Sequence, residues 1–112
     1  MKFKFAIGNT VEVPVKFSVN DGAKTSSQTV TLVCDRMSED ERKDHLKDGG
    51  LSVTDFMTKV TTGWKEQRFL LDEDDRPADF SPAALAALFG FPGLAVLAFT
   101  TYLKESGAKE KN

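Results

Sequence analysis

The single cysteine and the single histidine of this sequence are its candidates for nucleophilic chemistry. A thiol beside an imidazole can act as an activated nucleophile, which makes a Cys34–His45 pair conceivable. No third residue stands at a position that would orient the imidazole. Cys34 also shares the parity of the apolar residues in its predicted strand, which directs it into the core. We therefore interpret Cys34 as a buried apolar residue, and we expect neither enzymatic activity nor a cofactor.

The acidic stretch Asp72–Asp75 is the candidate for metal binding. A calcium-binding EF-hand loop needs alternating oxygen ligands, a glycine at its sixth position and a glutamate at its twelfth. Counted from Asp72, those positions hold Pro77 and Ala83. The sequence also lacks a glycine-rich phosphate loop and the Cys and His spacing of a zinc site. We expect 72–79 to be a solvated acidic loop without a metal ion.

The composition limits the classes of partner and the cellular compartment that are expected for this chain. The 112 residues carry seventeen acids and fifteen bases, a formal net charge of −2. A nucleic-acid-binding face would be strongly basic, so nucleic acid is not expected as a partner. One cysteine rules out an intramolecular disulfide and suits a reducing cytoplasm. The opening MKFKFAIGN lacks the continuous apolar run of a signal peptide, so the chain is expected to stay where it is made.

The pattern of apolar residues predicts an α+β fold in a single domain. The domain covers residues 1–106, with a β-meander over 1–36, a helical part over 37–106, and a disordered tail over 107–112. Alternating apolar and polar residues predict three antiparallel strands in the meander. They cover Phe3–Ile7, Val11–Val19 and Gln28–Cys34.

The predicted register keeps one apolar face together. A loop over Gly8–Thr10 sets Ile7 opposite Val11 and Phe5 opposite Val13. After a loose loop from Asn20 to Ser27, the third strand pairs with the second so that Phe17 faces Leu32, Val15 faces Cys34 and Val19 faces Val30. Pro14 lies on the polar face and indicates an edge strand.

About four helices are expected after Met37. A capping box of Ser38 and Glu41 begins a polar surface helix, which Leu46 anchors and Gly49-Gly50 ends. The next helix has the clearest periodicity of the chain. Its apolar face comprises Val53, Phe56, Met57, Val60 and Trp64 and is expected to pack on Leu85, Leu88 and Phe89. A short extended piece is predicted over Lys65–Leu71.

The stretch Phe80–Leu103 contains twenty-four residues without a formal charge. Ser81 and Pro82 predict a helix start and Gly90 predicts its end, while Pro92 predicts the first residue of a second helix that runs to about Glu105. A membrane-spanning segment is the alternative interpretation, because the length fits. The Gly-Phe-Pro-Gly centre argues against it, since it would interrupt a spanning helix in mid-bilayer.

The second of these helices carries apolar residues in two stripes. Leu94, Leu97, Ala98 and Thr101 form one stripe at helical spacing, and Ala95, Phe99 and Tyr102 form the other. One stripe should face the core and the other a partner or a second copy of the chain. We assign Phe99, Tyr102 and Ala95 to partner binding, because the polar tip of tyrosine suits a surface that alternates between wet and buried. The alternative is that both stripes lie in the core.

The order of features resembles that of phage tail assembly chaperones, small proteins encoded in the tail-morphogenesis modules of tailed phages and prophages. The resemblance rests on a Gly-Trp helix end, an acidic turn, a Phe-Ser opening with two leucines, a proline-started helix, and paired strands before them. The helix end is Val60–Trp64 and the acidic turn is Asp72–Asp75. Phe80-Ser81 is the Phe-Ser opening, followed by Leu85 and Leu88, and the proline-started helix is Pro92–Tyr102. The paired strands comprise the segments Val15–Phe17, Asp21-Gly22 and Thr29–Val33. The chain departs from the family pattern at Lys65–Arg68 and at Arg36–Glu39.

The resemblance implies a protein without an active site that binds the tape-measure protein, and in addition tail-tube subunits, during assembly in the bacterial host cytoplasm. It implies absence from the finished virion. The alternatives are a structural tail or head-tail joining protein and, with less support, a small protein anchored in a membrane by its C-terminal stretch.

Overall fold

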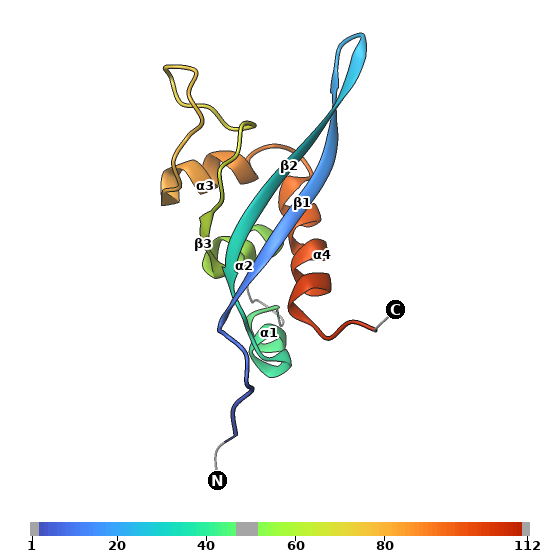
Figure 1. Cartoon of the computed structure of the whole chain (residues 1–112), viewed down its shortest axis with the longest axis vertical. Helices are drawn as coiled ribbons and strands as arrows, with labels where there is room; N and C mark the ends of the chain where they lie inside the picture. The colour runs from blue at the N-terminus through green and yellow to red at the C-terminus, as the bar shows by residue number, and fades with distance from the viewer. Residues whose placement is uncertain (1–2, 47–51, 111–112) are drawn as a thin grey trace.

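The computed structural model describes residues 3–46 and 52–110 of the chain. Its fold class is α+β, as predicted, with a three-stranded antiparallel sheet in the order β1-β2-β3 and four helices (Figure 1). The elements are β1 (Thr10–Asp21), β2 (Lys24–Asp35), α1 (Glu39–Leu46), α2 (Val53–Val60), β3 (Thr61–Trp64), α3 (Pro82–Phe89) and α4 (Leu94–Ser106).

Strands β1 and β2 form one long hairpin, closed by a two-residue turn. Asp21 pairs with Lys24, which leaves Gly22 and Ala23 as the central residues of the turn. Gly22 has a φ of 70°, the left-handed value that a type II′ turn requires at its first central residue. The predicted loose loop between Asn20 and Ser27 is therefore wrong. Polar residues continue the ladder there because both faces of the hairpin tip are exposed to solvent.

The tight turn also changes the register of the hairpin. Val15 pairs with Val30, Phe17 with Gln28 and Val13 with Leu32, so the predicted partners of Val15, Phe17 and Val19 are wrong. The prediction kept the correct parity, since a shift by an even number of residues leaves every apolar side chain on the same face. Pro14 lies on an edge strand, as predicted.

The first predicted strand, Phe3–Ile7, is not a strand. Its place as the third member of the sheet is taken by β3, which pairs with β2. The physical reason lies at Asn9, whose carbonyl accepts a hydrogen bond from the amide of Arg36 at 2.6 Å. This bond prolongs the β1–β2 ladder beyond Thr10, so the backbone at Asn9 and Thr10 is paired with β2 where the prediction placed a loop.

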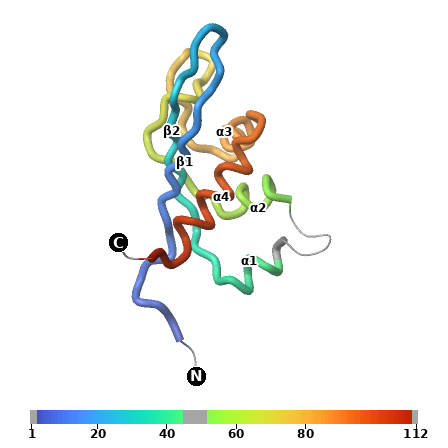
Figure 2. The backbone as a smooth tube through the Cα atoms, turned by 90° about the vertical axis from the view of Figure 1, so that its right-hand side faces the viewer, coloured from blue at the N-terminus to red at the C-terminus, as the bar shows by residue number. Residues whose placement is uncertain are grey.

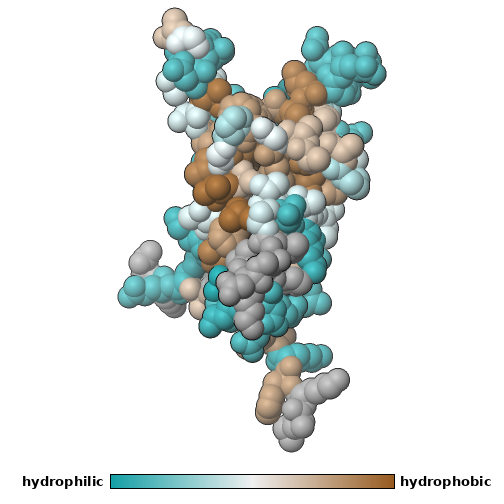
Figure 3. All heavy atoms as spheres, turned by 180° about the vertical axis from the view of Figure 1, so that it is seen from behind, coloured by the Kyte–Doolittle hydropathy of each residue, from teal (hydrophilic) through white to brown (hydrophobic). Residues whose placement is uncertain are grey.

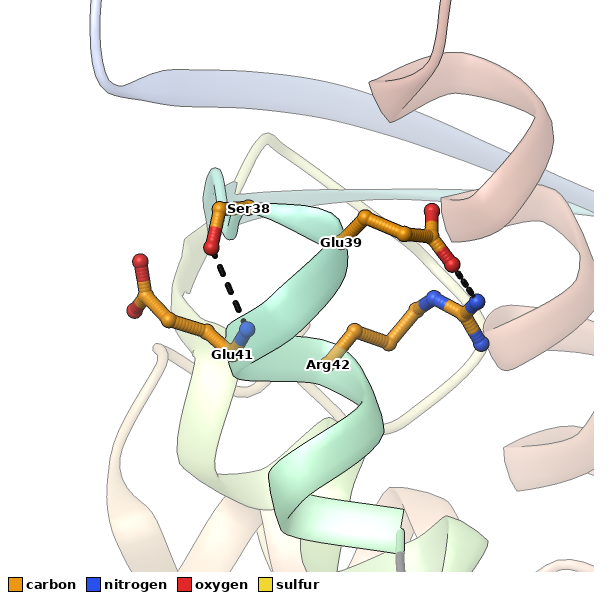
Figure 4. Close-up of polar contacts among 4 residues, drawn as sticks. All are labelled: Ser38, Glu39, Glu41 and Arg42. Atoms are coloured by element: carbon orange, nitrogen blue, oxygen red, sulfur yellow. Dashed lines mark hydrogen bonds and ion pairs between the residues drawn. The ribbon is translucent and has the colours of Figure 1, made fainter.

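Helix α1 begins with the predicted cap. The Ser38 hydroxyl accepts a hydrogen bond from the Glu41 amide at 3.1 Å, and Arg42 pairs with Glu39 one turn away (Figure 4). The described side chains of α1 are exposed or half-buried, as expected for a polar surface helix. The anchoring role of the Leu46 side chain and the end of the helix at Gly49-Gly50 lie outside the described residues.

Helix α2 presents the predicted apolar face but ends earlier than predicted. Phe56, Met57 and Val60 are fully buried, whereas Trp64 belongs to β3 and not to the helix. The helix stops because the Thr61 backbone is extended and its hydroxyl donates to the Met57 carbonyl at 2.6 Å. The residues after it pair with β2, with Gly63 opposite Val33.

The segment between β3 and α3 is a loop organised by two polar side chains. Gln67 is buried, and its carbonyl oxygen accepts from the amides of Phe69 and Leu70 at 2.8 and 2.7 Å. Asp72 accepts from the amides of Asp74 and Arg76 and stays exposed. A lone bridge between Leu71 and Pro77 replaces the extended piece that was predicted.

Helices α3 and α4 form the predicted pair with a sharp corner of 104° between them. The Ser81 hydroxyl accepts from the Ala84 amide at 3.0 Å, Pro82 is the first residue of α3, and Gly90 caps its end. Helix α4 begins at Leu94 and not at Pro92. Gly93 has a φ of 83°, a left-handed conformation that breaks the helical path just before Leu94.

All helices lie on one face of the sheet (Figure 2). The core between the two layers joins the inward residues of β1 and β2 to the buried faces of α2, α3 and α4. It comprises Val13, Val15, Val30, Leu32, Cys34, Phe56, Met57, Val60, Leu85, Leu88, Phe89, Leu94, Ala95, Ala98 and Tyr102. The predicted packing of the α2 face with Leu85, Leu88 and Phe89 is confirmed, and Trp64 and Val53 lie at its margin, half-buried.

Candidate functional site

An apolar surface on the outside of α4 is the candidate binding site of the chain. We define the outer face of α4 as Val96, Leu97, Thr100 and Leu103. Its three hydrophobic side chains are 58%, 43% and 36% exposed. Phe91, at the corner before α4, is also exposed. Figure 3 looks onto the helical side of the molecule and shows hydrophobic side chains open to solvent across its middle.

The outer face arises from the helical phase of α4. Leu94, Ala95, Ala98 and Tyr102 are buried, and they follow one another at spacings of one, three and four residues. Val96, Thr100 and Leu103 have the same spacing on the opposite side of the helix. Because α4 contacts both β1 and α2, the small side chains of Ala95 and Ala98 allow its backbone to approach them closely.

The structure places the predicted binding residues differently from the sequence analysis. Tyr102 is only 1% exposed and Ala95 is buried, whereas Phe99 is half-buried. Leu94 and Ala98 are in the core as predicted. Leu97, expected in the core, is exposed, so the predicted separation of the two stripes is wrong. Partner binding by Phe99, Tyr102 and Ala95 stays a prediction, and it now requires α4 to move away from the sheet.

Tyr102 and Phe99 both pack on the aromatic ring of α2. Their rings meet Phe56 edge-on, with centroids 5.8 and 5.5 Å from its own. The Tyr102 hydroxyl donates to the Asp35 carbonyl at 2.7 Å. Burial raises the pKa of this phenol, and the nearby Cys34 acts in the same direction. The polar tip that suggested a wet surface is thus satisfied inside the protein.

Cys34 lies at the centre of the core, as the strand parity predicted. Its thiol is fully buried, and its sulfur lies 3.6 Å from the hydroxyl oxygen of Thr61. Burial raises the pKa of the Cys34 thiol to about 11. A thiol in this environment stays protonated at neutral pH and is a poor nucleophile. The Cys34–His45 pair considered from the sequence is not tested, because the His45 side chain is outside what the structure describes.

The acidic loop has the geometry of a turn. Asp75 has a φ of 61°, and the Asp72 carboxylate caps backbone amides of its own loop. Across 3–46 and 52–110 no group of three or more His, Cys, Asp or Glu side chains is placed to hold a metal ion.

A groove lies between the start of the chain and the end of α4. It has a volume of about 470 Å³, and its lining includes Phe5, Ile7, Met37 and Leu103. Arg36 also borders it, donating from Nη1 to the Ser106 carbonyl at 2.6 Å, while its buried Nε has no hydrogen-bond partner in the described part of the chain. The groove therefore extends the apolar surface from Leu103 toward the sheet.

Comparison with known proteins found no matching family model, no matching curated relative and no matching solved structure. Among the described residues no single helix is long and apolar enough to cross a membrane. The pair α3 and α4 reaches that length and hydropathy only when the two bent helices are taken together. Seven residues of this pair are part of the core given above.

Sequence reasoning missed the outer face of α4 as a surface. The available signal was the position of the alanines. A helix that packs closely on a sheet turns its small residues inward, and Ala95 and Ala98 mark that side. Leu97 and Val96 then fall outside the buried arc by spacing alone.

Proposed function

We propose that the chain is a non-catalytic phage tail assembly chaperone, which binds the tape-measure protein and, in addition, tail-tube subunits during assembly in the bacterial host cytoplasm. The family resemblance supports the class of protein. The exposed outer face of α4 is the observation that carries the binding role. Contiguous apolar residues on a protein surface are typical of a site that another protein covers.

The chemistry of the outer face fits an amphipathic helix as the bound segment. Val96, Leu97 and Leu103 offer aliphatic side chains with no charge among them, flanked by the Thr100 hydroxyl. A helix that lays an apolar stripe on such a face buries area without any further chemistry. A long helical protein such as a tape measure has many such stripes to shield before it is assembled.

The experiment is co-expression with a candidate tape-measure protein, followed by solubility measurement and co-purification. We expect the wild-type chain to raise the soluble fraction of that protein and to co-purify with it. The double variant Val96→Ser, Leu97→Ser should lose co-purification by tenfold or more in yield, on the order of 1.4 kcal/mol of binding free energy. Both side chains are exposed, so the variant should keep the melting temperature of the wild type.

The matched control is Lys16→Ser, an exposed residue on the side of the sheet away from the helices, which should bind as the wild type does. Equal co-purification of the double variant and the control would contradict the outer face as the site. Stoichiometric amounts of the chain in mature particles would instead favour a structural tail or head-tail joining protein. Recovery of the chain with the membrane fraction would favour the membrane alternative.

A further inference from the structure

The segment Phe3–Ile7, called the arm below, stands away from the body of the protein. Phe3, Phe5 and Ile7 are 87%, 85% and 58% exposed, and among the exposed large hydrophobic residues only Val96 equals the value of Ile7. The groove of about 470 Å³ lies on one side of the arm, and a second hollow, lined by Lys4–Asn9 and Arg36, lies beside it. Figures 1 and 2 show the arm continuing away from the sheet beyond the start of β1.

No strand of the described chain pairs with the outer edge of β1. In the described sheet, β1 is an end strand with β2 on one side only. The bond from the Arg36 amide to the Asn9 carbonyl fixes the phase of the ladder: odd-numbered residues of β1 direct their backbone groups toward β2. Even-numbered residues, such as Thr10, Glu12 and Lys16, direct theirs toward the open edge. Pro14 alone lacks an amide there.

We propose that the arm of one copy of this chain pairs with the β1 edge of a second copy, and that the second copy returns its own arm in the same way. The product is a two-fold dimer with exchanged arms. This inference does not rest on the proposed chaperone function, since it uses the arm and the β1 edge and not the outer face of α4.

The register of the exchange follows from the sequence. The two strands run antiparallel and cross at Asn9, so that Ile7 of one copy faces Val11 of the other and Phe5 faces Val13. The same pairs form within one chain if it reverses at Gly8–Thr10. In domain swapping, such a hairpin opens into a straight strand and pairs with a second copy of the chain. The contacts stay the same, and only the chain that supplies them changes.

Both backbone and side chains match in this register. Thr10 and Glu12 point their backbone groups outward and would pair with Gly8 and Ala6 of the second copy. Phe3, Phe5 and Ile7 fall on the same face as Val11, Val13 and Val15, the face that packs on the helices. The exchange ends at Phe3, because one more residue would set Lys2 opposite Lys16, two like charges.

A second copy is a better occupant of the edge than an unrelated protein. Each chain carries both the exposed apolar strand and the open edge, and a closed two-fold exchange satisfies both at once. A foreign strand on the edge would leave the arm exposed. Pairing within one chain would require a loop over Gly8–Thr10, where Asn9 is hydrogen-bonded to Arg36 and Thr10 already pairs with Asp35 in the β1–β2 ladder.

The test is a cysteine pair placed across the proposed ladder. In the double variant Ala6→Cys, Glu12→Cys, the two positions face each other between copies, at a spacing that a disulfide can bridge. Mild oxidation should give a covalent dimer on a non-reducing gel in high yield. The native Cys34 can stay in place, because its thiol is buried. An intrachain disulfide, or no disulfide, would overturn the proposal.

The matched control is Ala6→Cys, Ser18→Cys, which places the second thiol roughly 20 Å further along the same edge. It should give at most a trace of covalent dimer, and a yield equal to that of the first pair would also overturn the proposal. In the unmodified chain, light scattering should report twice the monomer mass. The triple variant Phe3→Ser, Phe5→Ser, Ile7→Ser should report the monomer mass with an unchanged circular dichroism spectrum. A monomeric wild type, or a triple variant that stays dimeric, contradicts the exchange.

Discussion

Tyr102 ties the last helix of the chain to the sheet through its hydroxyl. The hydrogen bond to the Asp35 carbonyl, at 2.7 Å, joins residues 67 positions apart in sequence. From the sequence, Tyr102 was placed on a binding surface because of its polar tip, whereas the structure buries the ring and gives the tip a partner within the chain. The sequence could not indicate that the partner is a backbone carbonyl of the same chain, because that depends on how α4 lies against the sheet.

The buried thiol of Cys34 makes stability depend on alkaline pH. Burial raises its pKa from 9.0 to about 11; the contact with Thr61 lowers it in part, and Asp35 raises it again. Above pH 9 the unfolded chain loses this proton first, so the free energy of unfolding should fall as pH rises from 9 to 11. A pKa difference of this size corresponds to at most about 2–3 kcal/mol.

Urea denaturation at a series of pH values measures this dependence. Cys34→Ala should be less stable at neutral pH but should lose the part of the decline that begins near pH 9. The decline that remains above pH 10 belongs to other groups, including Tyr102, whose pKa is also raised by burial. Parallel curves for the wild type and Cys34→Ala would show that the thiol does not control alkaline stability.

At the scale of the element, α2 is the helix whose packing the sequence predicts best. Phe56 is fully buried and meets the rings of Phe99 and Tyr102. Replacing it with alanine removes a ring from the junction of α2 and α4 and leaves a cavity. We expect Phe56→Ala to reduce the free energy of unfolding by about 3–5 kcal/mol, measured by urea denaturation.

Thr58→Ala is the control for this substitution, because Thr58 lies on the exposed side of the same helix. It should change the free energy of unfolding by less than about 0.5 kcal/mol. A loss below about 1 kcal/mol for Phe56→Ala, one third of the smallest expected value, would reject Phe56 as a central core residue.

Local signals predicted the elements well where one short motif decides the structure. Ser38 and Ser81 cap their helices because a hydroxyl reaches an amide three residues on, and this needs no distant partner. The end of α2 and the strand β3 were missed for the opposite reason. Thr61 leaves the helix because β2 offers backbone partners, so tertiary pairing overrides the periodicity that reached Trp64.

The outer face of α4 was only partly predictable for a related reason. The sequence shows that α4 has more apolar residues than one narrow stripe can hold, but not which arc meets the body. Helix α4 contacts both β1 and α2, so the buried arc is wide and takes in Ala95 and Tyr102 together. Leu97 is left outside it.

At the scale of the whole molecule, the helices cover only part of the long hairpin, and its tip projects beyond them (Figure 1). The amides of Val15 and Val30 lie in the covered part of the ladder, whereas those of Val19 and Ser26 lie near the tip. The hydrogen-bond phase directs all four amides into the same ladder. We therefore expect the tip amides to exchange with solvent faster by roughly tenfold or more, because local opening there exposes no core.

Hydrogen-exchange mass spectrometry or NMR measures this gradient along each strand. The four amides belong to one ladder, so any difference among them reports the covering helices and not the pairing itself. Uniform exchange along the hairpin would mean that it opens as one unit with the core. Absent protection across the whole of Val11–Val19 would contradict the hairpin.

The contact between α4 and β1 has a consequence for the order in which the chain is made. Ribosomes deliver the hairpin early and α4 late, with roughly sixty residues, or several seconds of synthesis, between them. During that interval the apolar face of the hairpin has no α4 to cover it. The growing polypeptide therefore exposes an apolar, aggregation-prone face of the hairpin until α4 emerges. A message truncated before α4 yields a chain that exposes this face throughout its lifetime.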